Sequence, residues 1–401
     1  MAEPAPAAAG WRRPEVLLLL MAAAMPLAFG TWQVLLNNFA IERAQFSGAE
    51  IGLLQSLREV PGFLSFAVVF VLLLMREQTL ALVSLLLLGA GVAVTGLFPS
   101  LTGLLVTTFV MSVGFHYYET VRNSLTLQWI DKGRSAAFMG RMIGVGSAAS
   151  LAIYGISWLL LQGAGVPMEW VFALGGGLTV LLAAGAWLAF PQFKQPVEQH
   201  KKLILRSRYW LYYAITFLAG ARRQIFTVFA GFLLVERFGF DAAAISLIFL
   251  ANMALNVIIA PLIGRWVGLW GDRRALTVEY AGLVCVFTAY AFVDSAWLAV
   301  GLYLLDHVFF AMSIAIRTYF QKIADPADIA PTAGVAFTIN HIAAVALPLP
   351  LGLLWLTAPG AVFLIGAGLA VLSLLLVRLI PDAPEPGNEV LRPWRMARQP
   401  A

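Results

Sequence analysis

The stretch FAIERAQFSGAEIGLL, residues 39–54, has a counterpart later in the same chain. The segment LLVERFGFDAAAISLI, residues 233–248, aligns with it without a gap, at an offset of 194 residues that pairs Glu42 with Glu236. The same offset recurs far downstream. An offset that holds over several predicted helices indicates an internal duplication, so the chain is expected to consist of two related halves.

The composition places both halves in a membrane. Hydrophobic residues make up 61% of the chain, charged residues only 12%, and the mean hydropathy is +0.84. A membrane-spanning helix needs about 20 apolar residues, and the sequence has many such runs. The single cysteine, Cys285, excludes an intrachain disulfide and a multi-cysteine metal site. Helices are predicted at 15–41, 49–75, 78–98, 100–130, 135–162, 168–190, 208–238, 241–270, 274–294, 296–324, 331–357 and 359–380.

The longest polar interruption, PQFKQPVEQHKKLILRSRY at 191–209, follows the sixth predicted helix. It divides the chain into a six-helix half at 1–190, a basic linker at 191–208 and a six-helix half at 209–401. The predicted fold class is therefore an all-α polytopic membrane protein with twelve transmembrane helices in two pseudo-symmetric six-helix bundles.

The basic residues indicate an orientation. Lys and Arg gather in the linker and in loops on its side, whereas the opposite loops hold only Arg43 and Arg237. The positive-inside bias then predicts a multi-pass protein of the cell membrane with both termini in the cytoplasm. Anionic lipid headgroups account for the net charge of +5, and no nucleic-acid partner is needed to explain it.

Two tandem six-helix halves with a basic central loop resemble the major facilitator superfamily over nearly the whole chain. The loop GRWVGLWGDRR, residues 264–274, is similar to the family's loop signature, except that Gly268 stands where the family has an acidic residue. The resemblance implies that this loop helps to close the cytoplasmic side. The matching positions are Gly264, Gly271, Arg273 and Arg274.

The resemblance also implies a secondary transporter that works by alternating access. Its substrate, a small molecule, would bind near the midplane between the halves. It implies a monomer without a cofactor. An enzyme is not expected, because no phosphate loop, nucleophile motif or redox-metal spacing is found.

Polar residues inside the apolar runs are the candidate site. An ionisable group at the centre of a membrane helix costs about 2.5–3.5 kcal/mol, so such groups usually face a cavity or a partner. Arg58 and Glu59 are adjacent and are each expected to find a partner on another helix. The candidates for substrate binding are Gln33, Asn37, Arg58, His116, Arg222, Arg223, Asn252, Asn256, Asp306, His307, Asn340 and His341.

The stretch SVGFHYYETVRNSL, residues 112–125, combines several of these features. Helical periodicity places His116 and Glu119 on one stripe, with Arg122 one turn beyond Glu119. The stripe is expected to face water, substrate or an opposing charge. The alternative is a structural Glu119–Arg122 pair that only fixes the helix.

The surplus of arginines inside the helices favours an organic anion, because Arg recognises carboxylate and phosphate bidentately. Aromatic residues such as Trp32 and Phe226 would also suit an amphipathic solute. Coupling to protons needs a carboxylate that can bind and release a proton in an apolar setting. The candidates for this role are Glu59, Glu119 and Asp306.

Two other functions stay open at this stage. A divalent metal transporter would use imidazole and carboxylate ligands, which suit transition metals. A transporter-like scaffold or sensor would move no solute. The candidate metal ligands are His116 with Glu119, Asp306 with His307, and Asn340 with His341.

Overall fold

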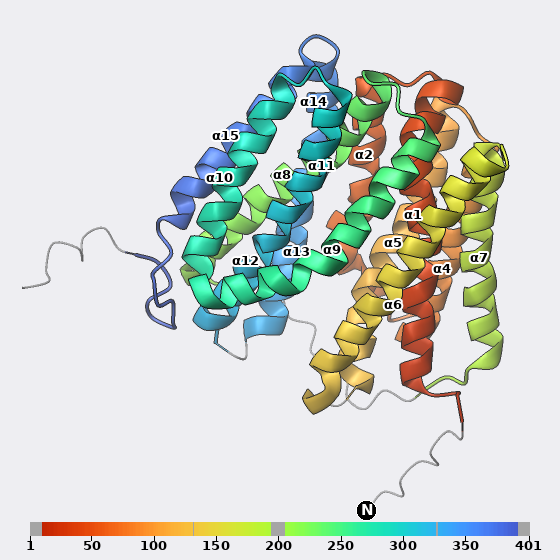
Figure 1. Ribbon diagram of the computed structural model, residues 1–401. Helices are drawn as coiled ribbons and strands as arrows, with labels where there is room; N and C mark the ends of the chain where they lie inside the picture. The colour runs from red at the N-terminus through yellow and green to blue at the C-terminus, as the bar shows by residue number, and fades with distance from the viewer. Residues whose placement is uncertain (1–9, 131, 194–204, 326–327, 392–401) are drawn as a thin grey trace, which may run out of the picture. The chain divides into compact units, whose positions relative to one another are not determined.

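The computed structural model describes residues 10–130, 132–193, 205–325 and 328–391. Wherever it describes one of the twelve predicted segments, that segment is helical over most of its length (Figure 1). The described chain contains no strand, and its one isolated β-bridge joins Glu385 and Asn388. The all-α prediction is confirmed.

The helices form two compact units. The first contains the described parts of Met1–Gln45, Leu64–Lys201 and Asp241–Met253, and the second contains the remainder. Helices of the first unit are α1 (Pro14–Ala44), α3 (Val68–Val71), α4 (Glu77–Thr95), α5 (Leu101–Trp129), α6 (Lys132–Trp158) and α7 (Met168–Ala189). Helices of the second unit are α2 (Gly48–Phe63), α8 (Trp210–Glu236), α10 (Asp272–Ala291), α11 (Ala296–Phe310), α12 (Ile314–Ile323), α13 (Ile329–Ala346), α14 (Pro348–Trp355) and α15 (Pro359–Val377).

Helix α9 (Ala242–Trp270) begins in the first unit and ends in the second. The predicted division at 191–208 stays a prediction, and residues 194–204 of that linker lie outside the described part of the chain. Below, the linker side of the second unit means the side at which α8 begins, directly after the linker.

Three of the predicted helices are interrupted, two of them beside a proline. After α2 the chain continues as a 3₁₀ turn at Leu64–Ala67, just beyond Pro61, which lacks a donor for the helix ladder. Pro348 likewise begins α14 after α13 ends. A 3₁₀ turn at Ala311–Ser313 separates α11 from α12, and a π turn at Leu159–Gly163 ends α6.

Among the described residues, ten helical segments are long and apolar enough to cross a membrane. The ten do not include α2, which has 16 residues, or α10, which begins with three consecutive charged residues. Helix α2 is too short because the helix is broken just beyond Pro61, whereas α10 is long enough but less apolar.

Close backbone contacts hold the first unit together. Helix α4 packs against α5 and α7, while α1 packs against α6 and α7. A side chain at Gly176 would collide with the backbone of Ala93 and Gly89, so glycine allows α7 to approach α4. Thr179 donates a hydrogen bond of 2.7 Å to the Ala24 carbonyl and thereby ties α7 to α1.

In the second unit α8 is the most buried of the long helices, and α10 runs alongside α15 (Figure 1). Helix α2 packs against α13 and α14. Glycines make this contact possible, because a Cβ atom on Gly52 would overlap the Pro348 carbonyl and the backbone of Gly352. This packing brings the charged residues of α2 beside α8 and α13.

We predict that Gly52→Ala lowers the free energy of unfolding of the purified protein by about 1–3 kcal/mol. The added methyl group would overlap the backbone of Pro348 and Gly352, which cannot move without disturbing α14. The matched control is Gly301→Ala in α11, where an added Cβ meets no atom within 4 Å. That control should be neutral or slightly stabilising, since alanine favours helix over glycine. Equal effects of the two substitutions on the melting temperature would refute the close α2–α14 contact.

Candidate functional site

Arg222 on α8 lies at the centre of a buried group of ionisable residues. It is 1% exposed, and its guanidinium carbon lies 4.2 Å from the centre of the Tyr280 ring on α10. Glu279, also on α10, is completely buried, and Asp306 on α11 is 5% exposed. Arg222 acts electrostatically on both carboxylates. These four residues are called the carboxylate cluster.

The charges of the carboxylate cluster do not balance. One guanidinium acts electrostatically on two buried carboxyl groups, so the cluster holds one carboxyl group more than Arg222 can neutralise. Within the described chain, none of the Arg222 guanidinium nitrogens and neither Glu279 oxygen makes a hydrogen bond of normal geometry. Such groups are costly to bury, which makes them candidates for a ligand or a proton.

Glu279 was missed by the sequence analysis. It lies two turns into α10, close to the charged start of that helix, and sequence position alone places it near the membrane surface. Its spacing of five and six residues from Arg274 and Arg273 does not distinguish a buried position from an exposed one.

Arg58 and Glu59 belong to a second group, which also contains Arg223, Asn340 and His341 and is called the arginine cluster. Arg58 and Glu59 form an ion pair with each other, and Arg58 Nε donates a 2.7 Å hydrogen bond to Gln55. The sequence analysis expected a partner for each on another helix, but these two residues also pair with each other, and Arg58 reaches back along α2 to Gln55.

Glu59 also reaches α13 within the arginine cluster. His341 donates from Nδ1 to the Phe337 carbonyl at 2.8 Å, which turns its Nε2 toward Glu59 Oε2 at 3.5 Å. Arg223 on α8 donates a 2.7 Å hydrogen bond to the side-chain oxygen of Asn340. Arg58 pairs with Glu59, and Arg223 interacts with the same carboxylate electrostatically, so the residues of the arginine cluster comprise two guanidinium groups and one carboxylate.

His116 and Glu119 lie in the first unit on α5. His116 is 2% exposed and contacts the edge of Phe115 at a centroid distance of 5.0 Å. Glu119 forms an ion pair of 2.8 Å with Arg122, and about a fifth of each side chain is exposed. The two residues therefore pair with each other along α5, one turn apart.

The remaining candidates occupy helix faces of intermediate exposure. His307 donates from Nδ1 to the Tyr303 carbonyl at 2.9 Å and contacts Phe226. The other four candidates, Gln33 and Asn37 on α1 and Asn252 and Asn256 on α9, are half-buried, with Asn252 in the first unit and Asn256 in the second.

Asp272, which the sequence analysis did not single out, connects the loop signature to α12. Gly271 adopts φ +78°, which favours glycine, and precedes the buried Asp272. Asp272 accepts hydrogen bonds from Thr318 at 2.5 Å and Lys322 at 2.7 Å, so it ties the start of α10 to α12. Of the predicted loop residues, Gly264 has open space around it, Arg274 is exposed and Arg273 pairs with Asp382 at 3.2 Å.

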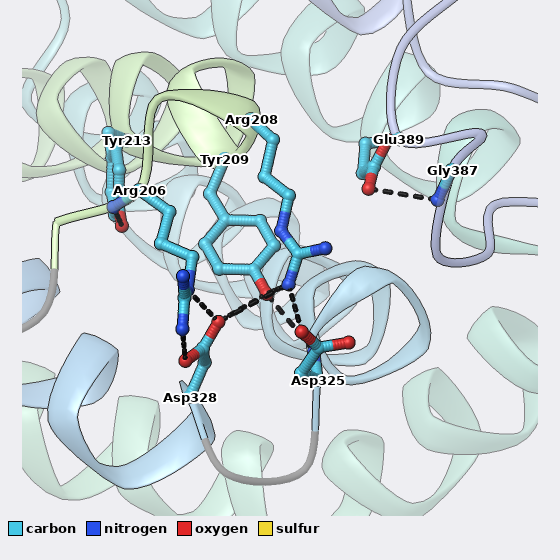
Figure 2. A network of polar contacts seen from close by, with 8 residues as sticks. All are labelled: Arg206, Arg208, Tyr209, Tyr213, Asp325, Asp328, Gly387 and Glu389. Atoms are coloured by element: carbon cyan, nitrogen blue, oxygen red, sulfur yellow. Dashed lines mark hydrogen bonds and ion pairs between the residues drawn. The ribbon is translucent and has the colours of Figure 1, made fainter.

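A polar network joins the end of the linker to the start of α13 (Figure 2). Arg206 forms a two-point ion pair with the buried Asp328, one contact of which measures 2.8 Å. Tyr209 donates to Asp328 at 2.9 Å, and Arg208 pairs with Asp325. The network fixes the linker side of α8 against the α12–α13 connection.

The Arg206 guanidinium holds the pKa of the Asp328 carboxyl below its ordinary value. Because the folded pKa is lowered, the ion pair stabilises the fold fully above about pH 4 and loses this effect as the pH falls through the lowered pKa. We predict that Asp328→Asn lowers the melting temperature at pH 7 and that the difference from the wild type shrinks toward pH 3.

The control for this prediction is Asp294→Asn, which changes an exposed carboxylate. Melting curves of the detergent-purified protein across pH 3–8 measure both variants. A difference that stays constant over this range for Asp328→Asn would contradict the role of the ion pair.

Comparisons with known proteins agree with this architecture. The family model described as Major Facilitator Superfamily matches residues 16–348. A mutant form of the nucleoside transporter NupG superposes with a TM-score of 0.75 at 14% identity, covering 91% of this chain and 99% of that chain.

A bacterial homologue of the human lysosomal transporter Spinster, in an inward-facing and occupied conformation, gives a TM-score of 0.71 at 15% identity and covers 94% of this chain and 98% of that chain. A search of curated protein sequences gave no match. At these identities the solved structures establish the fold alone. The family match over most of the chain, together with the apolar helices, shows that this multi-pass membrane protein belongs to the major facilitator superfamily of transporters.

Proposed function

We propose that the protein is a secondary transporter that couples the movement of a small organic anion to that of protons. The observation that carries the proposal is the divergence of two adjacent arginines on α8. Successive residues of a helix point about 100° apart. Arg222 enters a cluster with surplus carboxylates, whereas Arg223 enters a cluster with a surplus cation.

The arginine cluster supports an anionic substrate. Its single carboxylate, Glu59, faces both Arg58 and His341, while Arg223 meets the neutral side chain of Asn340. A carboxylate or phosphate on the substrate would supply the missing charge and accept paired hydrogen bonds from a guanidinium. Asn340 would exchange its contact for one to the substrate.

The carboxylate cluster supports proton coupling. Arg222 can neutralise either Glu279 or Asp306 but not both, so the second carboxyl carries a proton that the transport cycle can release. Glu119 is balanced by Arg122 in the first unit, which makes it a weaker candidate. We therefore place Asp306 and Glu279 ahead of Glu119 and Glu59. Each cluster contains one arginine of α8, Arg222 or Arg223. A change in the position of this helix would therefore affect both clusters.

A divalent metal ion is the second candidate ligand. The Nε2 atom of His341 and the Oε2 atom of Glu59, 3.5 Å apart, are of the type that binds transition metals. Arg58 and Arg223 act electrostatically on His341, and their positive charges would repel a metal ion bound between His341 and Glu59. This charge balance favours the anion.

We predict that Arg223→Gln reduces the stabilisation of the purified protein by its anionic ligand to about half or less. A library of organic anions, nucleosides and divalent metals is screened by thermal shift, with nucleosides included because a fold neighbour transports them. Saturation at a hundred times the dissociation constant should add about 2.7 kcal/mol. Loss of a charged hydrogen bond should weaken binding by about tenfold or more.

Arg237→Gln, which changes an exposed arginine just after α8, is the matched control and should bind as the wild type does. Stabilisation by metals alone, or an anion response that Arg223→Gln leaves unchanged, would reject the proposed anion site.

We predict a different result for the carboxylate cluster. Asp306→Asn or Glu279→Gln should abolish accumulation driven by a pH gradient in proteoliposomes, because the site for the coupling proton is lost. Exchange of substrate across the membrane at equal pH should persist. The exposed carboxylate variant Asp294→Asn should retain both activities. Full accumulation in both cluster variants would remove these residues from the coupling mechanism.

A further inference from the structure

A pocket of about 550 Å³ opens on the linker side of the second unit, and no residue of either cluster lines it. Its wall is formed by the end of α9, the start of α10 and the end of α15. The residues that decide its chemistry are Trp270, Arg273, Arg274, Arg378 and Asp382. It is called the basic pocket.

The basic pocket contains more positive than negative charge. Among the described residues, three guanidinium groups line it, and the one carboxylate in its wall belongs to Asp382, whose side chain is 85% exposed. Asp382 contacts Arg273 at 3.2 Å, which leaves Arg274 and Arg378 as the surplus cations of the pocket. Guanidinium groups on two helices that face one space are suited to bind a phosphate.

The placement of two of these arginines opposes the intrinsic preference of the helix. Arg273 and Arg274 occupy the first turn of α10, where the helix dipole favours negative charge. Two cations there gain nothing from the helix itself. A bound anion would be attracted by the arginines and by the helix dipole together.

The surroundings of the pocket indicate the source of the phosphate. Trp266 and Trp270 stack at a centroid distance of 5.6 Å, and tryptophan is typical of the membrane interface. Leu269 is 81% exposed beside Trp270, and Leu375 is 61% exposed one turn before Arg378. Apolar side chains exposed at these positions can contact acyl chains while the arginines hold a headgroup.

We propose that the basic pocket binds the phosphate of an anionic phospholipid, with Arg274 and Arg378 as its principal contacts. Asp382 occupies part of this space through its ion pair with Arg273 and competes with the phosphate. Basic pockets between membrane helices are suited to this role. A soluble phosphate would use the same arginines but not the apolar rim.

Native mass spectrometry of the detergent-purified full chain, titrated with phosphatidylglycerol or phosphatidylcholine, tests the proposal. We expect preferential retention of phosphatidylglycerol and about a tenfold loss of affinity for each of Arg274→Gln and Arg378→Gln. Asp382→Asn should raise the affinity, a gain that misfolding cannot produce. The double variant Arg12→Gln/Arg13→Gln, which removes two exposed arginines, is the control and should bind normally.

Two further arms identify the source of the phosphate. Inorganic phosphate and glycerol phosphate, added without lipid, should bind at least tenfold more weakly than phosphatidylglycerol. Binding of these soluble anions as tight as that of the lipid would overturn the lipid assignment. Equal retention of both lipids, equal losses in the Arg12/Arg13 control, or no gain in Asp382→Asn would overturn the site itself.

Discussion

The cost of burying charge in an apolar helix bundle is the constraint on which this structure depends. Arg222 is 1% exposed in the centre of the second unit, and it can be held there only because carboxylates and an aromatic ring surround it. A fixed cation of this kind restricts what its neighbours can be. It acts on both Glu279 and Asp306, which are one carboxyl group more than it can neutralise.

The same constraint explains why α2 packs against α13 and α14 in the second unit. Glu59 of α2 needs charged or polar partners in the helix bundle. Arg223 of α8 interacts with it electrostatically, and His341 of α13 lies 3.5 Å from it. Small residues such as Gly52 let the helices come close enough for these contacts. Packing and electrostatics therefore support each other, and both place ionisable groups on the two sides of α8.

Much of the fold could be predicted from the sequence, because apolar runs of spanning length and a repeated segment are local signals. The breaks at Pro61 and Pro348 are also marked in the sequence, although it does not reveal that α2 packs in the second unit. The site was harder to predict. Glu279 and Asp272 lie near charged helix ends, where sequence alone indicates exposure, yet packing buries both. The internal pairing of Arg58 and Glu59 depends on side-chain reach, which residue spacing does not reveal.

The most direct measurement of the central claim uses the purified protein in sealed proteoliposomes that contain a pH-sensitive dye. A gradient of the anionic substrate is imposed at equal internal and external pH, and the internal pH is followed. The proposed coupling predicts a change in internal pH that depends on the substrate and requires the protein. Substrate flux without any change in pH, once movement of other ions is blocked, would contradict it.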